Sequence, residues 1–158
     1  MKTGMSRGHA LVELIVVAVI LGVLAAVTLP RFGDTDDSRL SREAVRFERL
    51  LEFATQDALL TGRAVGVVFS PAGYAFRARG RDGRWADHPD GDLRARTLGP
   101  GMRVETVAVD GAPLEREALL LLAPAGDQPV YEVELAGPGG RARVGGNPVG
   151  NVRVARIP

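Results

Sequence analysis

The stretch RGHALVELIVVAVILGVLAAV, residues 7–27, decides how the rest of the sequence is interpreted. Residues 9–30 include one acidic side chain, Glu13, and otherwise no Asp, Glu, Lys or Arg. A helix of these 22 residues is about 33 Å long, which matches a bilayer core of about 30 Å. The sequence therefore predicts a single transmembrane helix over residues 9–33.

The flanking charges predict the orientation of this helix. Lys2 and Arg7 precede it without an acidic residue, so the N-terminus is expected in the cytoplasm and the rest of the chain across the membrane. The competing interpretation is a cleaved secretory signal peptide, with small residues at Ala25 and Ala26 near the cleavage point. The charge of Glu13 and the length of the apolar run both argue against it.

The composition excludes several other classes of protein. The chain has 158 residues, enough for one modest domain with an appendage, and a net charge of +1 from 20 basic and 19 acidic residues. It has no cysteine, and its two histidines, His9 and His88, lie far apart. No serine–histidine–acid set, phosphate-binding loop or metal-ligand spacing is present. We therefore expect no enzyme activity, no metal and no cofactor.

A second helix is predicted after the apolar segment. Pro30, Gly33 and Asp34 indicate a kink or loosened turn. A helix over residues 34–62 follows, because apolar residues recur there at spacings of four and three, and Gly62 provides a C-terminal stop. These residues are Leu40, Ala44, Phe47, Leu51, Ala54 and Ala58. Such a stripe could form a coiled coil, but it more often packs on a sheet.

Residues 63–158 have the pattern of an antiparallel β domain. Short runs rich in β-branched residues alternate with Gly, Pro and Asp, without helical periodicity. Residues 64–69 and 74–79 are expected to form a hairpin around a turn at residues 70–73. Further strands are expected at residues 93–98, 102–109, 119–122, 130–135, 142–144 and 152–157.

The N-terminal features together resemble those of type IV pilins and type II secretion pseudopilins. A short basic leader ends at Gly8, an acidic residue stands five positions later, and an apolar helix continues to Pro30. The resemblance implies that residues 1–8 are a leader, that a prepilin peptidase cleaves between Gly8 and His9, and that His9 is then N-methylated. Two positions depart from the family pattern: His9 replaces the usual Phe, and Ala10 replaces the usual Thr.

Cleavage would explain the carboxylate of Glu13. It creates a cationic amine at His9, and a buried carboxylate paired with an ammonium avoids most of the cost of an isolated charge in the membrane. The partner amine can belong to the same chain, one helical turn away, or to a neighbouring subunit. The resemblance favours the neighbour, and it implies that Glu13 and Pro30 set helix register during filament assembly.

The order of the later segments narrows the resemblance. TGRAVGVVFSPAGYAF, residues 61–76, and the late G-x-x-R and V-x-V patterns are similar to the H-type minor pseudopilins and FimT-like minor pilins. The implied fold is α+β and pilin-like, with a long N-terminal helix, half transmembrane and half amphipathic, packed on the β domain. The implied location is the inner membrane with a periplasmic C-terminal domain.

The implied function is that of a type II secretion minor pseudopilin near the tip of a periplasmic pseudopilus that exports folded proteins. The implied partners are other major and minor pseudopilins, the prepilin peptidase, the inner-membrane assembly platform and exported proteins. The alternative is a FimT-like minor pilin that primes type IV pilus assembly or binds DNA.

Two sets of charged residues are candidate binding sites. Asp82, Asp87, Asp90 and Asp92 provide oxygen atoms for calcium, but their spacing is not that of an EF-hand, so we expect a solvated loop. Trp85 in this loop is either a core residue or an exposed contact residue.

A possible DNA-contacting patch consists of Arg141, Arg143, Arg153 and Arg156. The sequence places no aromatic residues beside these arginines for base stacking, and alternating arginines on strands usually form a solvated face. Nucleic acid is therefore not an expected partner.

Overall fold

The computed structural model describes residues 13, 15–19, 36–115 and 118–157. Residues 1–34 and 35–158 form two separate units. The predicted leader and most of the predicted transmembrane helix lie outside the described residues; residues 13 and 15–19 are helical. No helix among the described residues is long and apolar enough to cross a membrane.

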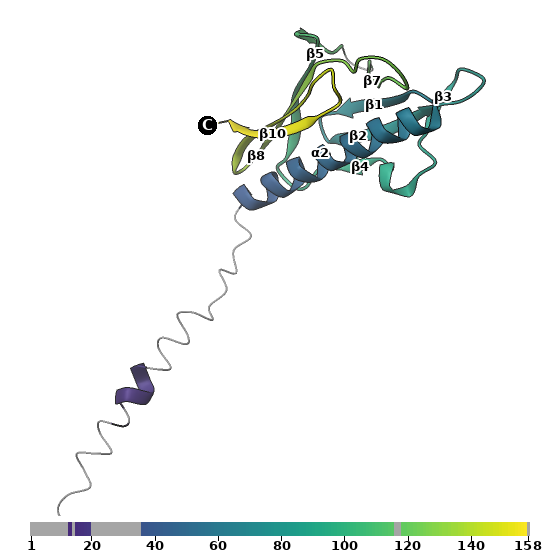
Figure 1. Ribbon diagram of the computed structural model, residues 1–158. Helices are drawn as coiled ribbons and strands as arrows, with labels where there is room; N and C mark the ends of the chain where they lie inside the picture. Colours follow the sequence, from purple (N-terminus) through teal and green to yellow (C-terminus); the bar gives the residue numbers. More distant parts are fainter. Residues whose placement is uncertain (1–12, 14, 20–35, 116–117, 158) are drawn as a thin grey trace, which may run out of the picture. The chain divides into compact units, whose positions relative to one another are not determined.

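The predicted amphipathic helix is α2, Asp36–Thr61. All six residues of the apolar stripe are buried, and Phe47, Leu51 and Ala54 have no exposed surface. Gly62 follows the helix with a φ of +66°, a left-handed conformation that glycine adopts without strain and that commonly ends helices. The 3.6-residue period of the sequence therefore defines one face of α2, which lies against the β strands in Figure 1.

The strands form two antiparallel sheets. Sheet A has the order β3-β2-β1-β7, with β4 also paired to β2, and sheet B has the order β10-β9-β8-β5-β6. Sheet A contains β1 (Val65–Ser70), β2 (Gly73–Arg79), β3 (Trp85–Asp87), β4 (Arg96–Thr97) and β7 (Leu119–Leu122). Sheet B contains β5 (Arg103–Val109), β6 (Ala112–Pro113), β8 (Tyr131–Gly137), β9 (Gly140–Gly146) and β10 (Val152–Ile157). The predicted α+β architecture is confirmed.

The core lies between α2 and the inner faces of both sheets. In β9, Ala142 and Val144 are buried while Arg141 and Arg143 point outward, the alternation expected of a sheet with one solvated face. Phe47 of α2 contacts the rings of Phe69 and Tyr74, with centroid distances of 6.1 and 4.4 Å. This aromatic group joins the helix to the β1–β2 hairpin, which the sequence predicted.

Two local predictions were wrong. Residues 93–98 do not form one strand: a 3-10 turn, Gly91–Leu93, comes first and the short strand β4 follows. The Asp90 side chain accepts a hydrogen bond from the Asp92 backbone N–H at 2.8 Å, which favours this turn, and Leu93 is fully buried within it. The expected solvated loop before it contains strand β3, which pairs with β2.

Candidate functional site

The residues predicted to direct processing and assembly belong to the N-terminal unit. Gly8, His9 and Pro30 lie outside the described residues. Glu13 lies on a helical segment and is exposed, as are residues 15–19, which follow it with the sequence IVVAV. Exposed apolar side chains of this kind are stable when lipid or another apolar surface covers them.

Three of the four arginines of the possible DNA-contacting patch lie on the outer face of sheet B, where they are partly neutralised, whereas Arg156 of β10 lines a groove beside α2. Arg141 lies 3.1 Å from the carboxylate of Glu105, and Arg143 donates a hydrogen bond of 2.8 Å to Glu134. This hydrogen bond lowers the pKa of Glu134, and the same contact raises the pKa of Arg143. Because carboxylates form ion pairs with two of the three arginines on this face, it is a poor binding surface for phosphates.

The aspartate-rich loop is fixed to α2 by a histidine. The buried ring of His88 lies 3.2 Å from Asp57 through Nε2, and its Nδ1 accepts a hydrogen bond from the Asp90 backbone N–H. The Asp82 side chain likewise accepts a hydrogen bond, from the Arg84 backbone N–H. Among the described residues, no three His, Cys, Asp or Glu side chains lie close enough together to hold a metal ion. The side chains of Asp82 and His88 therefore stabilise the loop through hydrogen bonds.

Trp85 is half-buried on the outer face of sheet A. A side chain at Gly66 would place its Cβ 3.1 Å from the indole and 2.9 Å from Leu119. The indole therefore extends across β2 to β1. It and the side chain of Leu119 both lie over Gly66, which has no side chain of its own to exclude them. Trp85 is thus neither a core residue nor fully exposed.

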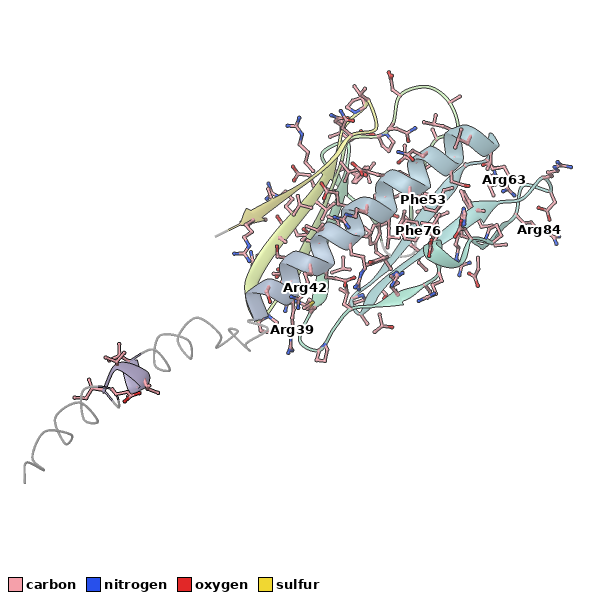
Figure 2. The ribbon with its side chains drawn as sticks, turned by 60° about the horizontal axis from the view of Figure 1, so that its bottom comes forward. Arg39, Arg42, Phe53, Arg63, Phe76 and Arg84 are labelled. Atoms are coloured by element: carbon pink, nitrogen blue, oxygen red, sulfur yellow. The ribbon has the colours of Figure 1, made fainter. Side chains whose placement is uncertain are left out.

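The exposed face of α2, on the side away from the core, carries arginines and large apolar side chains. We call this row of exposed residues the α2 crest; its members follow one another along the helix at alternating spacings of three and four. Figure 2 shows its labelled members Arg39, Arg42 and Phe53 along the helix. The full α2 crest is Arg39, Arg42, Arg46, Arg49, Phe53, Gln56 and Leu60, all exposed. The sequence predicted the apolar stripe of α2 but not this exposed set.

An open groove of about 900 Å³ runs beside the α2 crest. Its charged lining consists of one aspartate, Asp92, and five arginines: Arg42, Arg46, Arg49, Arg96 and Arg156. Beneath it, Glu43 accepts hydrogen bonds from Tyr74 and from Arg46, both at 3.0 Å. Burial, followed by the charge of Glu43, raises the pKa of Tyr74. The lining of the groove is therefore basic, and the neutral side chain of Tyr74 and the carboxylate of Glu43 lie below it.

Solved structures resemble the described domain over most of its length. The minor pseudopilin EpsH of the Vibrio cholerae type 2 secretion system matches 78% of this chain and 98% of its own, with a TM-score of 0.65 and 17% identity. The described domain has the minor pseudopilin fold. The solution structure of Escherichia coli GspH matches 79% of this chain and 94% of its own, with a TM-score of 0.56 and 19% identity.

Sequence comparisons agree with this minor pseudopilin fold. Type II secretion system protein H of Aeromonas hydrophila is 33% identical over 87 residues, 54% of this chain and 48% of that protein. The protein of the same name from Escherichia coli K12 is 32% identical over 77 residues, 48% of this chain and 46% of that protein. The matches thus span about half the length of these curated relatives, and no family model matches the chain. The predicted resemblance to the H type is confirmed.

Proposed function

We propose that this chain is the H-type minor pseudopilin of a type II secretion system and acts as a structural subunit of the pseudopilus. One observation carries the proposal: the domain of α2 and two antiparallel sheets matches nearly the full length of EpsH. The similarity to proteins named type II secretion system protein H supports the same conclusion. The work of such a subunit is mechanical and recognitional, and it requires no catalytic residues.

The N-terminal sequence supports a specific maturation pathway within this proposal. Residues 1–8 would be removed by a prepilin peptidase between Gly8 and His9, and His9 would be N-methylated. Residues 9–33 would anchor the chain in the inner membrane, residues 34–62 would form the amphipathic helix, and residues 63–158 would lie in the periplasm. After extraction from the membrane the subunit would join the pseudopilus near its tip.

Glu13 and Pro30 would fix the position of the helix in the assembly. The new amine at His9 supplies the positive charge that an intramembrane carboxylate requires. If the amine belongs to the neighbouring subunit, the ion pair between this amine and Glu13 forms in only one register of the two helices. Glu13 would then fix the position of one subunit relative to the next. The neighbours are other major and minor pseudopilins, and the assembly platform and exported proteins are further proposed partners.

A secretion assay tests this proposal. Deletion of the gene should reduce the amount of type II substrates in the culture medium, and the wild-type chain should restore it. Glu13→Ala should be cleaved normally but restore secretion poorly, because its register contact is lost; Arg153→Ala, an exposed change on β10, is the matched control. Normal secretion in the deletion strain, with loss of twitching motility or DNA uptake, would contradict the proposal and support the FimT-like alternative.

A further inference from the structure

The strand β7 ends sheet A and leaves one side of its backbone open. β1 lies between β2 and β7, as Figure 1 shows. The Arg79 N–H donates a hydrogen bond to the Ala64 carbonyl, so the even-numbered residues of β1 bond to β2 and the odd-numbered residues face β7. The register then turns the even-numbered residues of β7 toward β1. The N–H and C=O groups of Leu119 and Leu121 consequently point away from the sheet.

Within the described part of the chain, these outward groups of Leu119 and Leu121 have no hydrogen-bond partner. The next outward position, Ala123, is occupied by the buried carboxamide of Gln128. The Ala123 N–H donates to its Oε1 at 3.0 Å, and its Nε2 donates to the Ala123 carbonyl at 2.9 Å. A carboxamide offers the same donor and acceptor as a peptide group. The fold therefore already holds a peptide-like group beside β7, and we call the two open positions, Leu119 and Leu121, the β7 edge.

The other ends of the two sheets carry features that oppose strand addition. β10 presents the exposed charges of Arg153 and Arg156. β3 has three residues, including the exposed Asp87, and β6 has two, including Pro113. Charged side chains, proline and very short strands are the usual means by which proteins keep sheet edges from pairing. β7 instead consists of four leucines, Leu119–Leu122, without a charge.

The outer face of sheet A beside the β7 edge is apolar. Leu121 is 46% exposed. Leu119 is half-buried next to the indole of Trp85 over Gly66, and Val68, its partner in β1, is half-buried on the same face. Residues directly opposite one another in antiparallel strands point to the same face. An added strand would therefore place every second side chain beside these leucines and remove their apolar surface from water.

We propose that the β7 edge binds an extended, uncharged segment of another protein, which joins sheet A as an additional antiparallel strand with apolar side chains at every second position. The outward N–H and C=O groups specify an extended chain, because the backbone groups of a helix are already bonded within the helix. The apolar outer face specifies the alternating side chains. This proposal goes beyond the proposed function, which assigns no contact to sheet A.

A second copy of this chain fits the β7 edge less well. Antiparallel pairing of two β7 strands puts the start of one strand beside the end of the other. The exposed Glu115, which precedes β7, would then approach the loop after β7 of the other copy, which carries the exposed Asp127. Like charges in such positions oppose pairing. The segment of another protein is therefore the occupant that the observations favour, and a pair of copies becomes an outcome of the test.

The probe is a labelled peptide of about seven residues, a common strand length, in which valine and threonine alternate and a polyethylene glycol tail provides solubility. In one form every threonine is N-methylated, so only the valines offer N–H groups; in the matched form every valine is N-methylated instead. Fluorescence anisotropy measures binding to the full chain in phosphatidylcholine nanodiscs. We expect the threonine-methylated peptide to bind and the valine-methylated peptide to bind about tenfold more weakly or less, because it lacks the donors that face β7.

Substitutions at Leu121 locate the binding surface. Leu121→Pro removes an outward N–H but none of the groups that bond to β1, so it should weaken binding of the threonine-methylated peptide about tenfold or more. Leu121→Lys places a charge on the edge and should have the same effect, and it replaces the proline variant if that variant unfolds. Phe53→Lys is the matched control: Phe53 is 38% exposed, on α2 rather than on sheet A, and its replacement should leave binding unchanged. Circular dichroism checks folding.

Four results would overturn the proposal. The first is equal binding of the two methylated peptides, which would exclude backbone pairing. The second is unchanged binding in folded Leu121→Pro and Leu121→Lys. The third is an equal loss of binding in Phe53→Lys. The fourth is no binding of the threonine-methylated peptide, whether the wild-type nanodiscs hold one copy of the chain or, by mass photometry, pairs that Leu121→Lys separates. None of them bears on the proposed secretion function, because the secretion assay tests it separately.

Discussion

At the scale of single residues, one glycine determines where a core tyrosine can lie. Tyr131 of β8 pairs with Gly146 of β9 and is 3% exposed. A Cβ at Gly146 would overlap the ring of Tyr131. The ring thus occupies the space that any other residue at position 146 would need, in a core that has little room to adjust.

Gly146→Ala should therefore destabilise the domain. We expect a loss of about 2 kcal/mol or more in the free energy of unfolding, because the methyl group forces the ring and β9 apart. Gly91→Ala is the control, since a Cβ there meets no atom within 4 Å. Denaturant unfolding of the full chain in micelles measures both. Equal stability of the two variants would contradict the described packing.

The two tyrosines predict the behaviour of the protein at high pH. Burial raises the pKa of both Tyr74 and Tyr131 above their ordinary value of 10.0, and these are the chain's only tyrosines. A raised folded-state pKa stabilises the fold fully below pH 10, and this contribution is lost as the pH rises above it. Tyrosine ionisation, followed by ultraviolet absorbance, should coincide with unfolding. Ionisation at about pH 10 while the circular dichroism stays native would contradict this burial.

Part of this residue-scale detail was predictable from the sequence. The buried positions of α2 follow from a local period. The hydrogen bond between His88 and Asp57 does not, because it joins residues 31 positions apart that only the fold brings together. The pairing of Arg143 with Glu134 depends equally on strand register, so the sequence identified the charges but not their partners.

At the scale of elements, α2 has two independent faces. Phe47 is fully buried against Phe69 and Tyr74, whereas Phe53, on the α2 crest, is partly exposed. The first residue stabilises the domain. The second residue lies at the surface, where it contributes little to the core.

Replacement of the two phenylalanines should separate these roles. Phe47→Ala should cost about 3–5 kcal/mol, since it removes a buried ring and leaves a cavity. Phe53→Ala should change stability by about 0.5 kcal/mol or less, as expected for a surface position. Thermal unfolding monitored by circular dichroism compares them. A similar loss for both variants would show that the crest also belongs to the core.

Strand predictions succeeded where local patterns decide them. The β1–β2 hairpin follows from alternating residues around a turn, and it forms with Ser70 opposite Gly73. The prediction at residues 93–98 was wrong because Leu93 is buried by the 3-10 turn that Asp90 caps. β3 was missed because only its pairing with β2 makes three residues a strand.

At the scale of the whole molecule, the sheet order was the least predictable feature. β1 pairs with β7, although about half of the described domain separates the two strands along the chain. β5 pairs with β8, which is not the next strand in the sequence. Such long-range pairings leave no local pattern in the sequence. The fold class was predictable because the helix stripe and the short strands are local, and because the N-terminal motif resembles that of a known superfamily.

The proposed function requires that the chain is cleaved between Gly8 and His9 before it assembles. Intact-mass measurement with N-terminal sequencing, on the full chain produced together with the prepilin peptidase of its own system, tests it most directly. We expect a mature chain that begins at His9 and carries one methyl group on its N-terminus, and a Gly8→Asp variant that stays uncut. A wild-type chain that retains Met1, or one cleaved after Ala26, would contradict it.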